Sequence, residues 1–294
     1  FSLMGIDIGT SAVKGLLWRS DGNHRVVYRH ARESYVSNEG TAIPEQNPHK
    51  LWQIVKECIC EALRECDAGS VAGVGLSGHG PSLVPVDHGG NAVGNIITWM
   101  DPRPLMGPGC QTEPTTQGGP SFEATAQWID GQLQKASGRE DLDGRVRVLQ
   151  PKDYIGLRLT GEMCIDSSAA SCMNSSDPGA RLFPRVVHPW EAIGTVTRKA
   201  SGETGLPVGI PVAAGSVDAF VEALGAGLVD PGVICDSTGT STCVSKVAGG
   251  ECSLQTVKHV IPGARLIVSP ISYSGGCLAW GMSLLFPDVY SSEH

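Results

Sequence analysis

Several features that would assign this 294-residue sequence to particular protein classes are absent from it. It has no block rich in lysine and arginine, and its formal net charge is -8. Both observations disfavour nucleic acid or an anionic membrane surface as the main partner. No apolar run approaches the length of a membrane span, and the N-terminal residues lack the charged and apolar regions of a signal peptide. A membrane role is therefore not expected.

The ten cysteines are scattered, and no two of them have Cys-x-x-Cys spacing. The nearest two are Cys58 and Cys60. This pattern disfavours a disulfide or zinc framework and favours reduced, mostly buried thiols in a cytoplasmic protein. Hydrophobic residues make up 41% and charged residues 18% of the chain, which is typical of a globular protein with one or two domains.

Short apolar runs and helical patterns together predict an α/β fold. The expected strands are residues 3–8, 13–18, 25–28, 71–76, 83–86, 95–100 and 210–214. The clearest helix covers residues 48–66, where Leu51, Val55, Cys58 and Ala62 share one face, and a shorter one covers residues 219–228. Residues 102–120 have no apolar period and are rich in Pro, Gly, Thr and Gln, so we expect a long loop or disorder there.

The triplet Gly-Thr-Ser occurs twice, shortly after Asp7 and shortly after Asp236, each time between two apolar runs that predict strand, turn and strand. A turn of small residues lets backbone N–H groups and hydroxyls approach a phosphate, and a nearby carboxylate suits Mg²⁺. Two such hairpins facing each other would hold a nucleoside triphosphate from both sides. The alternative is a common turn triplet that recurs by chance. The turn residues are Gly9, Thr10, Ser11, Gly239, Thr240 and Ser241.

An ordered set of segments then resembles a known family. The segments are Met4–Lys14, Pro44–Gln46, Gly75–Gly80, Trp99–Arg103, Lys152–Ile155, Leu159–Glu162, Thr204–Pro207, Ala214–Asp218 and Asp236–Ser241. In this order they resemble the FGGY carbohydrate kinases, most closely the xylulokinase-like branch. The resemblance implies an actin-like ATPase (ribonuclease H-like) fold with two domains around a cleft. It also implies ATP and Mg²⁺ as cofactors, and phosphorylation of a hydroxyl group of a sugar or polyol, with a ketose such as xylulose favoured.

The resemblance also assigns roles at the phosphate end of the cleft. Asp218 matches the general base that accepts the proton of the sugar hydroxyl. The alternative is that it only caps the helix that begins at Ala219. Asp7 matches a position near Mg²⁺. Lys14 either pairs with a phosphate or is simply solvated.

At the sugar end, Ser77, Gly78 and His79 match a loop that touches the substrate. They follow an expected strand, at the end where open α/β sheets bind ligands. Trp99 is either a core aromatic residue or an apolar wall for the sugar. Asp101 and Arg103 either bind hydroxyl groups or pair with each other.

The sequence also departs from the family pattern. Residues 1–229 resemble the sugar-binding domain, but residues 230–294 resemble only the beginning of the nucleotide-binding domain, without the glycine-rich segment that holds adenosine. The regions between Gly138 and Pro151 and between Asp177 and Phe183 are also shorter. We therefore expect weak or absent kinase activity and association into homo-oligomers through exposed sheet. The alternatives are a non-catalytic relative that binds a sugar or a protein partner, and an actin-type or chaperone-type ATPase, which His79 and Asp218 disfavour.

Overall fold

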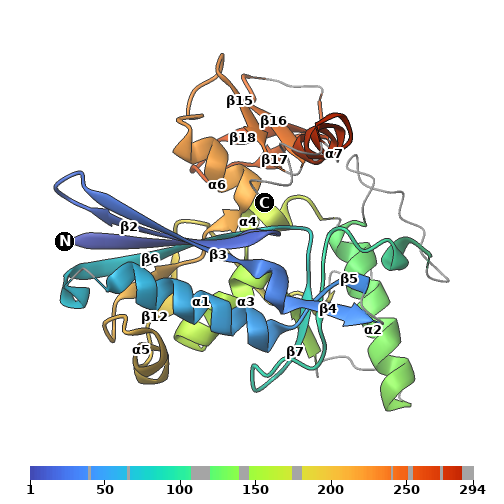
Figure 1. Ribbon diagram of the computed structural model, residues 1–294, viewed down its shortest axis with the longest axis horizontal. Coiled ribbons are helices and arrows are strands. Elements are labelled where there is room, and N and C mark those ends of the chain that lie inside the picture. The colour runs from blue at the N-terminus through green and yellow to red at the C-terminus, as the bar shows by residue number, and fades with distance from the viewer. Residues whose placement is uncertain are drawn as a thin grey trace.

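The chain forms a larger lobe and a smaller lobe in the computed structural model (Figure 1). The structure describes residues 1–38, 41–64, 67–106, 120–138, 146–173, 181–239, 241–250, 254–271 and 274–286. Thr240 and the two segments expected to be shortened therefore lie wholly or largely outside the described residues, as does most of the expected loop at 102–120. Among the described helices, none combines the length and apolar character that a membrane span requires.

A seven-stranded mixed sheet forms the centre of the larger lobe, with the strand order β12-β13-β6-β1-β2-β3 and β14 paired to β6. Its strands are β1 (Ser2–Ile8), β2 (Ala12–Arg19), β3 (His24–His30), β6 (Val71–Gly78), β12 (Ala192–Thr195), β13 (Pro211–Ala213) and β14 (Ser216–Val217). β1 is antiparallel to β2 but parallel to β6, so the turn after β1, with Gly9 and Thr10, and the loop after β6 lie at the same edge of the sheet.

Helices α1 (Pro48–Leu63) and α3 (Pro151–Thr160) lie on one face of this sheet, while α6 (Asp218–Gly225) lies on the other and leads into the smaller lobe (Figure 1). α1 begins where expected, because Asn47 accepts hydrogen bonds from the backbone N–H groups of His49 and Lys50 and Pro48 occupies the first turn. Its expected apolar face is buried against β2 and β3. α5 (Arg198–Thr204) packs on α1 and α3.

The rest of the larger lobe consists of short strands and turns, the short helix α4 and the 16-residue helix α2. They are β4 (Tyr35–Asn38), β5 (Thr41–Gln46), β7 (Val84–Asp87), β8 (Ile96–Ile97), α2 (Phe122–Ser137), β9 (Val146–Leu149), β10 (Cys164–Asp166), α4 (Ser167–Ala170), β11 (Arg185–Val187) and three 3-10 turns at Ala31–Ser34, Ala68–Ser70 and Arg103–Met106. The expected strand at 95–100 is shorter than predicted, because Asp101 N–H bonds the Thr98 carbonyl and turns the chain. The described start of the expected loop at 102–120 is a 3-10 turn.

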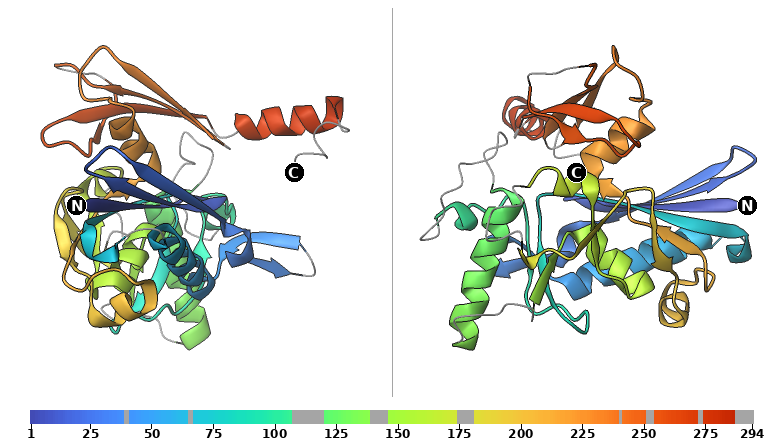
Figure 2. Two further views of the ribbon diagram at one scale, coloured as in Figure 1. Left: turned by 60° about the vertical axis from the view of Figure 1, so that its left-hand side comes forward. Right: turned by 180° about the vertical axis from the view of Figure 1, so that it is seen from behind.

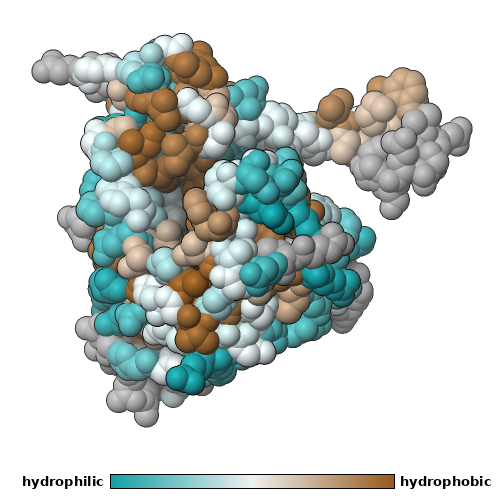
Figure 3. Space-filling view, turned by 90° about the vertical axis from the view of Figure 1, so that its left-hand side faces the viewer, coloured by the Kyte–Doolittle hydropathy of each residue, from teal (hydrophilic) through white to brown (hydrophobic). Residues whose placement is uncertain are grey.

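The smaller lobe is an antiparallel sheet of order β15-β16-β18-β17, formed by β15 (Ile234–Thr238), β16 (Thr242–Val247), β17 (Val257–Lys258) and β18 (Arg265–Ile271). Its buried side chains join a second core with Phe220 of α6. Helix α7 (Gly275–Leu285) projects away from both lobes (Figure 2). No residue of α7 is buried, and Trp280 is 67% exposed. Apolar side chains also gather on the face of this lobe seen in Figure 3.

The described cysteines are free thiols, as expected, but the expectation that most are buried is wrong. Cys58 and Cys164 are buried, whereas Cys60, Cys172 and Cys277 are exposed. Cys60 lies two residues beyond Cys58 on α1, which turns it away from the face that packs on the sheet.

Candidate active site

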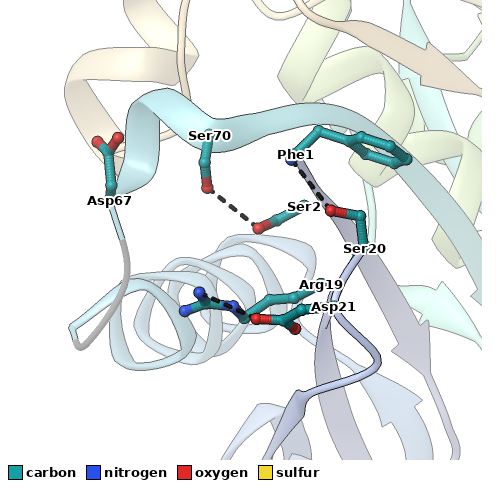
Figure 4. A pocket seen from close by; sticks show the side chains of 7 residues that line it. All are labelled: Phe1, Ser2, Arg19, Ser20, Asp21, Asp67 and Ser70. Carbon is teal, nitrogen blue, oxygen red and sulfur yellow. Dashed lines mark hydrogen bonds and ion pairs between the residues drawn. The ribbon is translucent and has the colours of Figure 1, made fainter.

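A cavity of about 700 Å³ lies between the two lobes and brings together the residues of both Gly-Thr-Ser turns. Several of the residues singled out in the sequence line it, and they come from both ends of the chain. They are Asp7, Gly9, Thr10, Ser11, Lys14, His79, Trp99, Asp218, Gly239 and Ser241. A second cavity of about 140 Å³ borders the opposite end of β1, where Arg19 pairs with Asp21 and Ser2 with Ser70 (Figure 4). The larger cavity is therefore the candidate site.

The first turn joins β1 to β2, whose register sets Asp7 opposite Lys14. Gly9 N–H donates to the Ala12 carbonyl at 2.9 Å and closes the turn. A Cβ atom at Gly9 would lie 2.8 Å from that carbonyl oxygen, so a larger residue would force the turn to shift. Lys14 Nζ lies 3.3 Å from the Asp7 carboxylate and is half-exposed at the cavity, which is compatible with either alternative for Lys14.

The second turn joins β15 to β16 and is closed by Gly239 N–H, which donates to the Ser241 carbonyl at 2.8 Å. A Cβ atom at Gly239 would meet nothing closer than 3.9 Å, so the turn presents an open surface. Gly275, at the start of α7, packs against the other side of the turn, where its own Cβ would lie 2.2 Å from the Gly239 carbonyl oxygen. Only a glycine at 275 allows this approach.

Asp218 is the first residue of α6 and borders the cavity. Its Oδ1 accepts a hydrogen bond of 2.8 Å from the backbone N–H of Ala219. The helix cap expected of Asp218 is not formed as predicted, because α6 begins at Asp218 itself and Val217 occupies the N-cap position. The side chain does border the cavity. Burial, together with the nearby charge of Asp7, raises the pKa of Asp218 to about 7. A carboxyl group with a pKa near neutrality is suited to exchange a proton with a substrate.

The backbone before Asp218 is held by a buried network that the sequence alone did not reveal. Ser216 Oγ donates to Asp166 at 2.7 Å, and Lys152 Nζ lies 3.0 Å from the same carboxylate. Lys152 also donates to the Ala214 carbonyl at 3.3 Å. The available signal was the Lys152–Asp153 pair within a helix that is otherwise largely apolar.

Ser77 and Gly78 lie behind the cavity wall rather than on it. Ser77 Oγ donates to Asp7 Oδ1 at 3.0 Å. A Cβ at Gly78 would lie 3.1 Å from Lys152 Cβ, so the glycine allows β6 to approach α3 closely. These two residues support the site through their neighbours.

His79 and Trp99 do border the cavity. His79 is 2% exposed, and burial lowers its pKa to about 4, so the ring is neutral at pH 7. The Trp99 indole Nε1–H donates to Thr10 Oγ1 at 3.0 Å, which links this part of the cavity to the first turn.

Asp101 and Arg103 pair with each other, and neither lines the cavity. The guanidinium also bonds Glu45 at 2.5 Å and lies 4.9 Å from the ring centroid of Trp128. Of the two alternatives, mutual pairing is the one seen in this structure. Trp128 belongs to α2, which begins at the Ser121 cap and ends at Gly138 in the left-handed conformation.

Residues 2–107 match the N-terminal domain of the FGGY family of carbohydrate kinases. Among curated proteins, a xylulose kinase of Lactococcus lactis is 27% identical over 326 residues, covering 99% of this chain and 64% of that protein. An erythritol kinase of Brucella abortus is 26% identical over 274 residues, covering 82% of this chain and 49% of that protein. The chain thus spans less than two thirds of the length of these relatives.

Solved structures show the same fold. The xylulose kinase from Rhodospirillum rubrum aligns with a TM-score of 0.79 at 23% identity, covering 98% of this chain and 64% of that one. Plasmodium falciparum glycerol kinase with ADP aligns with a TM-score of 0.75 at 14% identity, covering 96% of this chain and 63% of that one. These likenesses confirm the predicted actin-like ATPase fold.

Proposed function

We propose that this chain, a member of the FGGY family of carbohydrate kinases, binds ATP and a sugar or polyol in the cavity between its lobes and phosphorylates one hydroxyl group, with a ketose such as xylulose as the favoured substrate. One observation carries the proposal: two similar turns from distant parts of the sequence line the same cavity as Asp218. A phosphoryl transfer site needs donors around the phosphates and one group that orients the attacking hydroxyl, and this cavity offers both.

Asp218 is the proposed general base. It accepts the proton of the sugar hydroxyl as that oxygen attacks the γ-phosphorus of ATP. Its pKa of about 7 leaves a substantial ionised fraction at neutral pH. The hydrogen bond from Ala219 N–H to Oδ1 fixes the direction of the carboxylate. The second oxygen, Oδ2, is therefore the one proposed to meet the substrate.

The two turns are the proposed phosphate sites, with Gly9 on one side and Gly239 on the other. On the β1 side, the oxygen atoms that could coordinate a metal ion belong to the Asp7 carboxylate and the Thr10 hydroxyl. Mg²⁺ prefers oxygen ligands of this kind. Within the described residues, no cluster of three or more His, Cys, Asp or Glu side chains would hold a metal alone. Mg²⁺ would therefore arrive with the phosphates, whose charge it neutralises, and Asp7 would hold it from the protein side.

The sugar is proposed to bind beside His79 and Trp99, with Phe122 on the same wall. Trp99 would offer its ring face, and His79 one ring nitrogen. Asp101 and Arg103 would shape this end indirectly, because Arg103 ties the segment after Trp99 to Glu45 on β5.

Isothermal titration calorimetry of this chain against a panel of ketoses and polyols, with and without ATP and Mg²⁺, tests the proposal. We expect sugar binding for at least one ketose. In a coupled assay we expect at most weak ADP release, as the sequence predicts, and Asp218→Asn should remove it. Sugar binding without any ADP release would favour the alternative of a non-catalytic sugar-binding relative. Absence of binding to every sugar and to ATP would refute the proposal.

A further inference from the structure

His79 is one of the residues that line the cavity, and one of its ring nitrogens has no partner among the described residues. It follows β6 directly, and its side chain is almost fully buried. Nδ1 lies 2.8 Å from Ser82 Oγ. Nε2 is buried and has no hydrogen-bond partner among the residues that the structure describes. A buried polar atom without a partner costs free energy unless a ligand bonds it.

Ser82 determines which ring nitrogen carries the hydrogen. Its side chain is fully buried, and its Oγ accepts the backbone N–H of Trp99 at 3.0 Å. A hydroxyl group has one hydrogen to donate and two lone pairs to accept. If Nδ1 of His79 also donated to this oxygen, the Ser82 hydrogen would be left buried without an acceptor among its described contacts. The arrangement without that penalty has Ser82 donating to Nδ1, so that Nε2 carries the ring hydrogen.

The chain of hydrogen bonds continues to the first phosphate turn. The backbone N–H of Trp99 donates to Ser82 Oγ, and the indole Nε1–H of Trp99 donates to Thr10 Oγ1. Tyr35 adds a second bond to the same turn, through its hydroxyl and the Thr10 carbonyl at 3.1 Å. Ser82 therefore lies in a connected set of buried and partly buried donors and acceptors, which limits its freedom to rotate away.

We propose that Ser82 is a positioning residue that holds His79 in its Nε2–H tautomer, so that the sugar end of the cavity offers a hydrogen-bond donor and selects a ligand oxygen that accepts. A carbonyl oxygen of an open-chain ketose meets this requirement, as does a hydroxyl oxygen. The His79 tautomer does not depend on the proposed function, whereas the identification of the ligand as a sugar rests on the proposed function.

The tautomer can be measured directly by ¹⁵N–¹H NMR of the histidine rings in the ligand-free chain at pH 7. The His79 signals are assigned by their loss in His79→Gln. His259 is an internal reference, because its Nε2 lies 2.8 Å from the Leu228 carbonyl, which can only accept. We expect both rings to show the Nε2–H pattern. We expect Ser82→Ala to shift His79 toward a mixture of tautomers while His259 stays unchanged.

A parent His79 with hydrogen on Nδ1 would overturn the inference, whether or not the variant folds. An unchanged His79 tautomer in a folded Ser82→Ala would overturn the role of Ser82. Ser82→Thr keeps the hydroxyl and should keep the parent pattern, which separates the hydrogen bond from a packing effect.

Calorimetry with xylulose measures whether the Ser82 substitutions change sugar affinity. We expect Ser82→Ala to weaken sugar affinity by about 2- to 10-fold, the range expected for one hydrogen bond, and Ser82→Thr to restore it. Ser137→Ala, at the exposed end of α2, is the matched control and should leave affinity unchanged. Confirmation of the tautomer without xylulose binding would remove xylulose as the substrate in the proposed function and leave the tautomer standing. Equal sugar affinity in the parent and Ser82→Ala would overturn the specificity role.

Discussion

Lys152 Nζ lies 3.0 Å from the carboxylate of Asp166, and both side chains are completely buried. Burial alone would lower the pKa of Lys152, but the charges of Asp153 and Asp166 outweigh that effect and raise it. The lysine therefore stays charged inside the protein. Through Ala214 and Ser216, this buried group fixes the chain immediately before Asp218.

We predict that Lys152→Met destabilises the fold by about 3–5 kcal/mol, because it leaves buried carboxylates without their partner. Denaturant unfolding measures the loss. Arg185→Met is the matched control, since Arg185 and Glu162 are 3.6 Å apart and both are about half exposed. An exposed pair of this kind contributes about 0–1 kcal/mol. Equal effects of the two substitutions would contradict the importance of the buried network.

Gly215 is the position where backbone geometry controls Asp218 most directly. Its φ is +62°, and an added Cβ would lie 1.6 Å from the Leu76 carbonyl oxygen on β6. We predict that Gly215→Ala pushes β14 away from β6 and lowers both stability and any kinase activity. Gly209→Ala is the control, because Gly209 has φ +86° but nothing within 4 Å of an added Cβ. Its cost is limited to backbone strain, about 1–2 kcal/mol. If Gly215→Ala and Gly209→Ala lose equal free energy of unfolding, overlap of the added Cβ with β6 is not the cause of the loss in Gly215→Ala.

Local signals predicted much of the fold. One apolar face was enough to predict α1, whose start the structure places at the Asn47 cap, and the expected strands 13–18 and 25–28 pair as β2 and β3. The order of motifs predicted the actin-like fold. α2 and α3 were missed, although Ser121, Gly138 and Gly161 are ordinary helix start and stop residues.

The rest of the site depends on tertiary contacts. Ser82 is a short polar residue in a loop, and only the pairing of Leu83 with Ile97 brings it to Trp99. Similarly, the sequence did not show that Arg103 pairs with Glu45. The pairing of β5 with β8 brings Glu45 within reach of Arg103. Sequence spacing shows which residue types are near one another along the chain. It does not show which distant segment supplies the partner.

The Gly239 turn provides a clean test of the proposed phosphate site. An added Cβ at Gly239 meets no atom closer than 3.9 Å, so Gly239→Ala should not strain the protein itself. We predict unchanged thermal stability but weaker ATP binding, because the methyl group would stand where a phosphate approaches the turn. Fluorescence titration with a nucleotide analogue measures the affinity. Gly131→Ala, on α2 with nothing within 4 Å, is the control for nucleotide affinity. It should itself raise stability, because Ala is the better helix former. Unchanged nucleotide affinity in Gly239→Ala would remove this turn from the phosphate site.

Asp218→Asn tests the proposed general base. We predict that sugar-dependent ADP release falls by about 10²–10⁴-fold, the usual contribution of such a group. Sugar affinity should stay within a few fold, because Asn keeps the size of the side chain and the bond from Ala219 N–H. Turnover at the parent rate would show that another group accepts the proton.

Asp218→Asn should also change how the stability of the protein depends on pH, and this can be measured without any kinase activity. The folded pKa of Asp218 is about 7, well above the value of about 4 expected in the unfolded chain. An acid whose pKa is raised by folding contributes its stability fully below the unfolded pKa and loses it as pH rises through the folded pKa. An asparagine side chain stays neutral at every pH, so the Asp218→Asn variant should gain stability relative to the parent between about pH 4 and pH 8.

Thermal unfolding of both proteins across that range, without Mg²⁺ or nucleotide, measures the difference. We expect the two midpoints to diverge as pH rises toward 7 and to stay apart above it. Asp21→Asn is the control, because the Asn23 N–H bond lowers the pKa of the exposed Asp21 and so confines its effect to pH values below about 4. The difference between Asp21→Asn and the parent should therefore stay constant across the measured range. A constant difference between Asp218→Asn and the parent at every pH would mean that Asp218 titrates as an ordinary carboxyl group. Its burial beside Asp7 would then have no effect on the proton that the proposed mechanism requires it to accept.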